Sequence, residues 1–492
     1  MINLTQRIGL AALLLSLSSC AVFAQKVPSD NRQAIKEADI KRDLYKLADD
    51  HFQGRVAGSL NELKASAWIA EQLRAMGLQP AGDDGTYFQF FHIQRTRVSE
   101  TSRFVLGGKA FTYGPDVIAL APAIASVDAP LVYVGTGTPA DMANVDVKGK
   151  AVAILFSGNP PGDLSFRRFM LSTMNKRAAE LVKAGAVATI FISDDRAQAV
   201  YNWWSSAMEM GRYDLPGGPN TRVFSQAPLL WMPADKLPLV KQPNQQFTNV
   251  VNVESFSYPS VNIVAKLPGT DPKLRDENVL ISTHQDHDGI RRAVAGDSIY
   301  NGADDNATGC AAALAIGRAF VQKPGKRSLL IVFHGAEERG LLGSRYFVEH
   351  PMVPKSSIVA VLNGEMMGRN NPDSAALLGS QLPHRNSIAL VNDAMEANRA
   401  DTKFKLDTLW DRPDHPEGWY FRSDHLPYAR AGIPAICFTT LLHPDYHTPR
   451  DEPARIDYAK LTRMTRWMYL TAWRVANGAT KPAVDVGFKL ER

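Results

Sequence analysis

In the second half of the chain, short apolar runs repeatedly end in acidic residues or histidines. Four such runs stand in the segments ENVLISTHQD, SLLIVFHGAEERG, SSIVAVLNGEMMGR and IPAICFTTLLHPDYH. Their length and apolar content are typical of buried strands in an α/β sheet. Because open α/β sheets bind ligands at the carboxyl ends of their strands, we expect the polar residues to share one edge of the sheet.

The first half of the chain predicts a different organisation. Residues 38–78 have the spacing of two amphipathic helices, with the loop QGRVAGS between them. From about residue 122, segments such as APLVYVGTG, VKGKAVAIL and KAGAVATIFI predict strands and a helix separated by turn residues, without a candidate ligand cluster. The segment SSAMEMGRYDLPGGPN, near residues 205–220, is interpreted as a surface loop.

Five residues in separate motifs are of the type that binds zinc. Zinc takes imidazole nitrogens and carboxylate oxygens, and the candidates are His284, Asp305, Glu338, Glu365 and His447. Each has an ordinary explanation: Asp305 would cap the following helix, Glu338 would form a solvated acid pair with Glu337, Glu365 would pair with Arg369, and a lone histidine usually has no special role. Their joint occurrence at strand ends favours a metal site.

Four further residues are candidates for the chemistry around such a site. Glu337 stands beside a proposed ligand and is free to act as a general base. Asp286 is expected to accept the second ring N–H of His284. Tyr446 is placed to donate a phenolic hydrogen bond, and Arg422 is either a substrate contact or part of a surface ion pair.

The motifs together resemble the co-catalytic di-zinc aminopeptidases, a family that includes bacterial leucyl-type enzymes and, more distantly, glutamate carboxypeptidase and the transferrin receptor. The matching segments are HQD, DDNATG, AEERGLLGS, NGEMMGR, RSDHLPYARAGIPA and YHTPRDE. The resemblance implies that Asp305 bridges two zinc ions, with His284 and Glu365 completing one site. The resemblance also implies that Glu338 and His447 complete the other zinc site. Glu337 would be the general base, and Tyr446 would donate a hydrogen bond to the oxyanion.

The resemblance also implies the architecture. We expect a three-layer α/β peptidase domain with a mixed central sheet and flanking helices, interrupted by a mostly-β protease-associated domain that VDVKGKAVAIL and KAGAVATIFI resemble. The expected division is a signal peptide over 1–24, an N-terminal part of the peptidase domain over 25–121, and the inserted domain over 122–255. The catalytic domain then covers 256–480 and a tail 481–492.

One residue departs from the family pattern, because Glu365 stands where these aminopeptidases usually have aspartate. The predicted function is removal of N-terminal residues from peptides by a zinc exopeptidase. A carboxypeptidase or dipeptidase of the same superfamily stays open, as do a catalytically inactive receptor-like module and a glutaminyl-cyclase-like zinc transferase. Side-chain preference and oligomeric state are left undetermined.

The N-terminal segment and the composition predict where the protein is located and which partners are not expected. The apolar run from Ile8 to Leu17 after Arg7 is too short to span a bilayer and is typical of an export signal, which predicts a periplasmic or secreted protein. Cleavage after Ala24, or lipid attachment at Cys20 as in a membrane-anchored lipoprotein, are both open. With a net charge of +5 and no basic tract interleaved with aromatics, nucleic acid is not expected as a partner.

Overall fold

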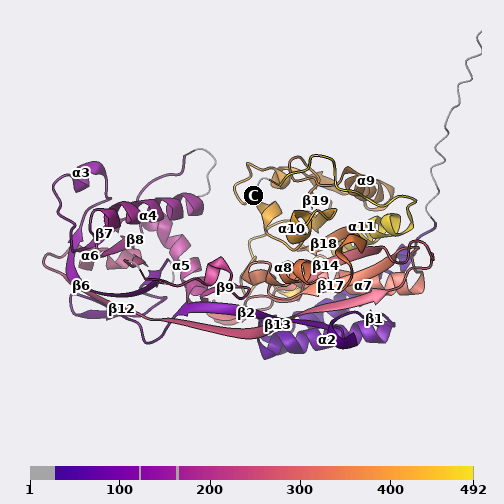
Figure 1. Cartoon of the computed structure of the whole chain (residues 1–492), viewed down its shortest axis with the longest axis horizontal. Helices are drawn as coiled ribbons and strands as arrows, with labels where there is room; N and C mark the ends of the chain where they lie inside the picture. Colours follow the sequence, from indigo (N-terminus) through magenta and orange to yellow (C-terminus); the bar gives the residue numbers. More distant parts are fainter. Residues whose placement is uncertain (1–27, 121–122, 162–165, 226, 491–492) are drawn as a thin grey trace, which may run out of the picture.

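The computed structural model describes residues 28–120, 123–161, 166–225 and 227–490. These residues form two lobes, each built around its own large sheet (Figure 1). The export segment predicted at the N-terminus and Cys20 lie outside the described residues. Within the described ranges, no helix has the length and apolar content needed to cross a membrane.

A ten-stranded mixed sheet forms the core of the larger lobe. Its strand order is β20-β19-β21-β18-β14-β17-β13-β2-β9, with β1 paired to β13. The four central strands, β21, β18, β14 and β17, run parallel, and antiparallel strands flank them. The bounds are β1 Gln79–Pro80, β2 Phe88–Val98, β9 Arg212–Asp214, β13 Val253–Leu267, β14 Asn278–His284, β17 Ser328–His334, β18 Ile358–Glu365, β19 Ser374–Leu378, β20 Lys405–Asp407 and β21 Ala435–Thr439.

Helices cover both faces of this sheet, because alternate strand residues point to opposite sides. Val279 and Ile281 of β14 pack in one core with α1, α2, α7, α9 and α11, whereas Leu280 packs in a second core with α8 and α10. The helices are α1 Glu37–Leu47, α2 Leu60–Met76, α7 Thr308–Gln322, α8 Leu342–Glu349, α9 Ile388–Ala397, α10 His425–Arg430 and α11 Tyr458–Asn477. The expected three-layer α/β domain is confirmed.

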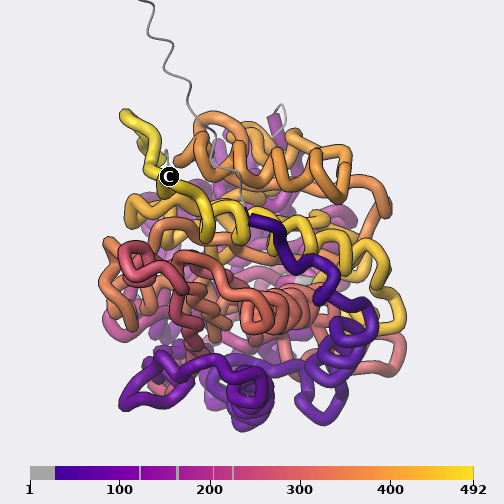
Figure 2. Tube along the Cα trace, turned by 90° about the vertical axis from the view of Figure 1, so that its right-hand side faces the viewer, coloured from indigo at the N-terminus to yellow at the C-terminus, as the bar shows by residue number. Residues whose placement is uncertain are grey.

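The start of the described chain lies beside its last helix (Figure 2). The Trp473 indole of α11 donates a hydrogen bond to the Pro28 carbonyl at 2.9 Å, and the Tyr469 hydroxyl accepts from the Asn31 amide at 2.8 Å. The predicted pair of N-terminal helices is confirmed as α1 and α2. The N-terminal segment therefore completes the helical layer of the larger lobe.

The smaller lobe is a nine-stranded sheet with helices of its own. The strand order is β4-β3-β12-β6-β7-β8-β11-β5, with β10 paired to β6. The bounds are β3 Arg103–Leu106, β4 Lys109–Phe111, β5 Ile118–Ala119, β6 Ala123–Tyr133, β7 Ala151–Leu155, β8 Ala188–Ile192, β10 Phe224–Ser225, β11 Leu229–Met232 and β12 Gln246–Val251, and the helices are α3 Pro139–Met142, α4 Phe166–Lys183, α5 Asp195–Met210 and α6 Leu237–Val240. Separate apolar cores cover its two faces.

The two lobes exchange strands near the predicted domain boundaries. Strands β3, β4 and β5 precede residue 122 yet belong to the smaller sheet, and β9 lies within the predicted insertion yet pairs with β2 of the larger sheet. The prediction of a surface loop over 205–220 is wrong in part. Its first residues continue helix α5 to Met210, and Tyr213 and Asp214 are buried in the larger lobe because β9 adds to the edge of β2.

A long antiparallel ribbon joins the lobes. Strand β13 pairs with β2 along its first eleven residues, from Val253 opposite Val98 to Ile263 opposite Phe88. A single residue separates β13 from β12, which belongs to the other sheet. The ribbon runs along the base of both lobes (Figure 1).

Candidate active site

The proposed metal ligands meet at the carboxyl edge of the central sheet. Strand β14 ends at His284 and the neighbouring strand β18 ends at Glu365. Strand β17, on the other side of β14, ends just before Glu337 and Glu338. Because all three strands run parallel, their carboxyl ends deliver these side chains to one place, as the apolar runs predicted.

Asp305 reaches the same place from the loop before α7. The Asp451 carboxylate, from the segment that follows β21, accepts the backbone N–H groups of Asp304 and Asp305, with N–O distances of 3.0 Å. The Asn306 side-chain amide donates to the Gly364 carbonyl at 2.9 Å, next to Glu365. These contacts fix the loop against two strand ends, so the position of Asp305 is set by buried hydrogen bonds.

A buried arginine holds the loop from the opposite side. Arg55, from the QGRVAGS segment, is 1% exposed. Its guanidinium donates to the carbonyls of Leu47, Gln285 and Asn301 at 2.6 to 2.7 Å and of Gly302 at 3.1 Å. Arg55 therefore connects the end of β14 to the Asp305 loop and places a positive charge behind a group of carboxylates.

The first half of the site contains one histidine and two carboxylates. His284 Nε2 lies 3.2 Å from Asp305 Oδ1 and 3.3 Å from Glu365 Oε2. Glu337 Oε2 is more distant from the same nitrogen, at 3.9 Å. The Ser423 hydroxyl donates to Glu365 at 2.7 Å and so fixes the carboxylate that β18 delivers.

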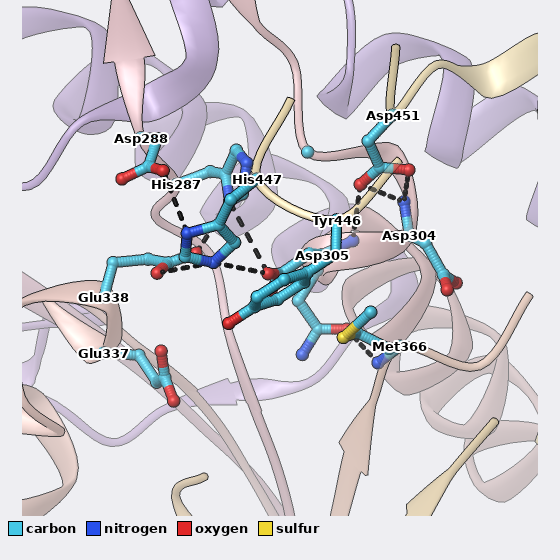
Figure 3. A network of polar contacts seen from close by, with 12 residues as sticks. His287, Asp288, Asp304, Asp305, Glu337, Glu338, Met366, Tyr446, His447 and Asp451 are labelled. Carbon is cyan, nitrogen blue, oxygen red and sulfur yellow. Dashed lines mark hydrogen bonds and ion pairs between the residues drawn. The ribbon is translucent and has the colours of Figure 1, made fainter. Parts of the chain in front are cut away.

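The second half uses the other oxygen of Asp305. His447 Nε2 lies 3.1 Å from Asp305 Oδ2 and 3.2 Å from Glu338 Oε2. This buried ring nitrogen has no hydrogen-bond partner among the described residues, although it faces two carboxylate oxygens (Figure 3). A nitrogen and two oxygens directed at one point are the donor set that zinc takes, so the residues fit the metal.

The charges at the site favour cations. Burial raises the pKa of Glu337 well above its usual value and also raises that of Glu365. Burial opposes ionisation of Glu338 as well, but the nearby His447 holds the pKa of Glu338 well below its usual range. The pKa of His447 is in turn well above its usual value, because the Glu338 charge outweighs the burial that lowers it. Carboxyl groups outnumber histidines at the site. Divalent cations would neutralise the excess negative charge of these carboxylates.

The role predicted for Asp286 requires a correction. The ring nitrogen Nδ1 of His284 lies 3.1 Å from the backbone carbonyl of Asp286 and 3.8 Å from its carboxylate. The carboxylate instead accepts the backbone N–H groups of Glu337 at 2.9 Å and Glu338 at 3.3 Å. The chain turns after β14, so the Asp286 side chain points to the next loop and orients the two glutamates.

Tyr446 and Arg422 form one unit beside the cluster. Arg422 donates to the Tyr446 hydroxyl at 3.1 Å and to Glu417 at 2.9 Å, and its guanidinium lies 4.5 Å from the centre of the Trp419 ring. Burial raises the pKa of Tyr446, which therefore stays protonated at neutral pH and keeps a hydrogen to donate. The predicted ion pair of Arg422 is present, and its guanidinium still lies at the site.

The ordinary explanation for Glu365 does not hold, and the other histidine after β21 lies apart from the site. Arg369 pairs with Asp445 at 2.7 Å, and Glu365 instead faces His284 at 3.3 Å. His443, the other histidine after β21, faces Asp304 at 3.4 Å and does not join the group around Asp305.

Two residues that the sequence motifs did not single out contact the proposed ligands. His287 Nδ1 lies 2.7 Å from Glu338 Oε1, and Asp288 Oδ2 lies 3.1 Å from His447 Nδ1. Both directly follow the HQD motif, so the signal was present in the string HQDHD. Two histidines and two aspartates in five residues allow several assignments, and the path of the loop after β14 decides between them.

The segment that holds the proposed ligands is similar to a known peptidase family. Residues 262–472 match the family model described as peptidase family M28. Aminopeptidase YwaD of Bacillus subtilis (strain 168) is 23% identical over 479 residues, which cover 94% of this chain and 90% of that protein. Leupeptin-inactivating enzyme 1 of Streptomyces exfoliatus is 37% identical over 196 residues, which cover 38% of this chain and 37% of that protein.

Solved structures agree on the fold. BSAP, described as a zinc aminopeptidase from Bacillus subtilis, superposes with a TM-score of 0.60 at 19% identity, covering 94% of this chain and all of that chain (100%). A peptidase M28 precursor from Shewanella amazonensis SB2B superposes with a TM-score of 0.55 at 17% identity, covering 92% of this chain and 96% of that one. The matched segment, residues 262–472, holds all five proposed ligands and is similar to peptidase family M28, and this match with the aminopeptidase relatives supports a metallo-exopeptidase.

Proposed function

We propose that this chain is a zinc aminopeptidase that holds two zinc ions and removes N-terminal residues from peptides. The observation that carries the proposal is the placement of Asp305, whose two oxygens face two different histidines. His284 and Glu365 would complete one zinc site, and Glu338 and His447 the other. The relatives named as aminopeptidases support the choice of terminus.

The remaining residues supply acid–base chemistry and orientation. Bound zinc supplies a Lewis acid that polarises the peptide carbonyl and lowers the pKa of water. Glu337 lies outside both ligand sets and takes the proton of the attacking water at its carboxylate, then passes it to the leaving amine. The Tyr446 hydroxyl donates to the developing oxyanion, while Arg422 fixes that hydroxyl. Asp286 holds the backbone on which Glu337 stands.

We expect one peptide in two blocked forms to identify the terminus. The zinc-loaded enzyme should cleave the C-blocked peptide and leave the N-blocked peptide intact, because an aminopeptidase needs a free N-terminal amine. Mass spectrometry of the products measures this directly. Cleavage of only the N-blocked form would instead establish a carboxypeptidase.

Peptide turnover also distinguishes a peptidase from a zinc transferase and from an inactive module. A peptide that begins with glutamine and releases ammonia without chain cleavage would indicate a cyclase-like transferase. Absence of turnover on all peptides by protein that holds zinc would indicate an inactive binding module. Either outcome overturns the proposed function.

Glu365 provides a prediction about geometry. Glu365→Asp shortens the side chain and withdraws the carboxylate from His284 and from the Ser423 hydroxyl. We expect kcat on the best substrate to fall by about a hundredfold, because a misplacement of roughly 1 Å costs that much. Zinc content should stay at the wild-type level, since aspartate is also a ligand.

Steady-state kinetics with elemental analysis of zinc measure the effect. Glu349→Asp, at the exposed end of α8, is the matched control and should behave as wild type. An unchanged kcat for Glu365→Asp would show that the longer side chain does not set the catalytic geometry.

We also propose that the protein is exported, on the basis of the N-terminal apolar run in the sequence. The described residues contain two cysteines, Cys310 and Cys437, and both are buried and free. Mass spectrometry of the mature N-terminus separates cleavage after Ala24 from lipid attachment at Cys20. An N-terminus that begins at residue 1 in the mature protein would contradict export by either route.

A further inference from the structure

We propose that the adjacent residues His287 and Asp288 are positioning residues that fix the Glu338–His447 half of the metal site, each holding one of its two terminal ligands. Figure 3 shows both residues beside this half, with Glu337 apart from them. The inference rests on the proposed two-zinc function. It assigns a task to two buried groups that the reaction itself does not use.

His287 holds Glu338. Its ring is fully buried, and Nδ1 lies 2.7 Å from Glu338 Oε1, a hydrogen-bond distance. Oε2 of the same carboxylate faces His447, so the two oxygens have separate partners. His287 Nδ1 lies in the same cluster of donors as Asp305, Glu338 and His447, but at 4.0 Å it is farther from Asp305 Oδ2 than His447 Nε2 is, at 3.1 Å. In this arrangement the His287 Nδ1–H donates its hydrogen bond to the Glu338 carboxylate and so supports a proposed metal ligand.

The backbone keeps the His287 ring in this position. A Cβ atom added at Gly302 would come within 2.4 Å of the ring, so the glycine leaves the space that the ring occupies. The carbonyl of the same glycine accepts from Arg55. The loop that carries Asp305 and the ring that supports Glu338 are thus packed against each other.

Asp288 holds His447. Its carboxylate lies 3.1 Å from His447 Nδ1, the ring nitrogen that points away from Asp305 and Glu338. A carboxylate at this position fixes the tautomer and the ring direction and raises the basicity of the other nitrogen. Arg291 and Arg339 also contact the Asp288 carboxylate, at 2.5 and 3.3 Å, and hold it in place.

The two halves of the site are therefore supported unequally. His284 is oriented by a backbone carbonyl, whereas His447 is oriented by a carboxylate. The support of the second half extends to the edge strand β9 of the larger sheet, because the Arg339 guanidinium lies 5.3 Å from the centre of the Tyr213 ring. We expect loss of His287 or Asp288 to weaken one zinc ion and to spare the other.

Substitutions at His287 test the hydrogen bond itself. Asparagine places an amide nitrogen where Nδ1 stands, while phenylalanine keeps the ring shape without a donor. In calorimetric titration of metal-free full-length protein with zinc, His287→Phe should weaken one of two binding steps by about 10–100-fold. His287→Asn should restore that step to within a few fold of wild type, and His92→Asn, at an exposed histidine, should change neither step.

Asp288→Asn tests the second contact. The amide oxygen still accepts from His447 but carries no charge, so we expect the same binding step to weaken by about tenfold. Wild-type affinities for both zinc ions in His287→Phe and Asp288→Asn would overturn the inference, as would equal weakening of both steps. If wild-type protein binds fewer than two zinc ions, the proposed function fails instead.

A loss of fold would not imitate the expected result. Circular dichroism of each metal-free variant checks folding, and His287→Asn and Asp288→Asn keep the shape and polarity of the buried groups. Rescue by His287→Asn but not by His287→Phe is the signature of a hydrogen bond, since a packing role would favour phenylalanine. The reverse order of affinities would contradict the inference.

Discussion

Asp305→Ala is expected to lose both zinc ions and all measurable peptidase activity. The two oxygens of this carboxylate face His284 Nε2 and His447 Nε2 at 3.2 and 3.1 Å, so one substitution removes an oxygen from each half of the site. Elemental analysis after dialysis measures the metal. The increase in melting temperature that zinc gives the wild-type protein should also disappear, because metal that binds only the folded state stabilises it by mass action.

A finer variant tests the bridge more sharply. Asp305→Asn keeps the shape but turns one oxygen into a donor, so we expect at most one zinc ion to remain. Asp276→Ala, at an exposed aspartate outside the site, should retain wild-type metal and activity. Two zinc ions held by Asp305→Asn with unchanged affinity would show that the carboxylate does not bridge.

Glu337→Gln is expected to keep both zinc ions and to lose about 10²–10⁴-fold in kcat, the usual contribution of a general base. The Glu337 carboxylate lies 3.9 Å from His284 Nε2, farther than either ligand of that half. Glutamine fills the same space but cannot take a proton from water. Zinc analysis together with kcat on the best peptide measures both parts of the prediction.

A control variant and the measured zinc content show whether the loss of kcat comes from removing the base. Glu349→Gln makes the same chemical change on an exposed helix end and should be silent. Loss of zinc from Glu337→Gln would place Glu337 among the ligands. Wild-type kcat with full zinc content would exclude it as the base.

The sequence was sufficient to predict the strand ends that carry the site. Buried parallel strands read as continuous apolar runs, and β14, β17 and β18 each end at or just before a candidate residue. Parallel strands carry such residues to one edge, so the proximity of His284, Glu338 and Glu365 followed from the pattern. The three-layer arrangement followed from the family resemblance, which the comparisons confirm.

The hydrophobic pattern of the sequence could not predict the contacts around the proposed ligands. Asp286 is two residues from His284, yet its carboxylate turns to the backbone of Glu337, because the loop after β14 leaves the strand direction. The same turn brings Asp288 to His447. Strand periodicity ends with the strand, and side-chain directions in a loop depend on distant contacts such as those of Arg55.

The exchange of strands between the lobes could not be predicted from the sequence for a related reason. Strand β9 has three residues and no apolar run of its own, so nothing in its sequence separates it from a turn. Its pairing with β2 is decided by the exposed edge that β2 offers. A deletion of residues 122–255 would therefore remove β9 with Tyr213 from the larger sheet and would leave β3, β4 and β5 of the smaller sheet behind.

The ribbon of β2 and β13 has a consequence for how the chain folds. Val98 pairs with Val253, so the catalytic sheet joins residues separated by the whole smaller lobe, and such distant pairing carries a large loop-closure entropy. Within the smaller lobe, Leu106 of β3 already pairs with Phe247 of β12. Once that lobe has folded, it holds the ends of β2 and β13 side by side. The entropic cost of closing the loop between these two strands has then already been offset. We therefore expect the smaller lobe to set the register in which β2 and β13 of the larger sheet pair.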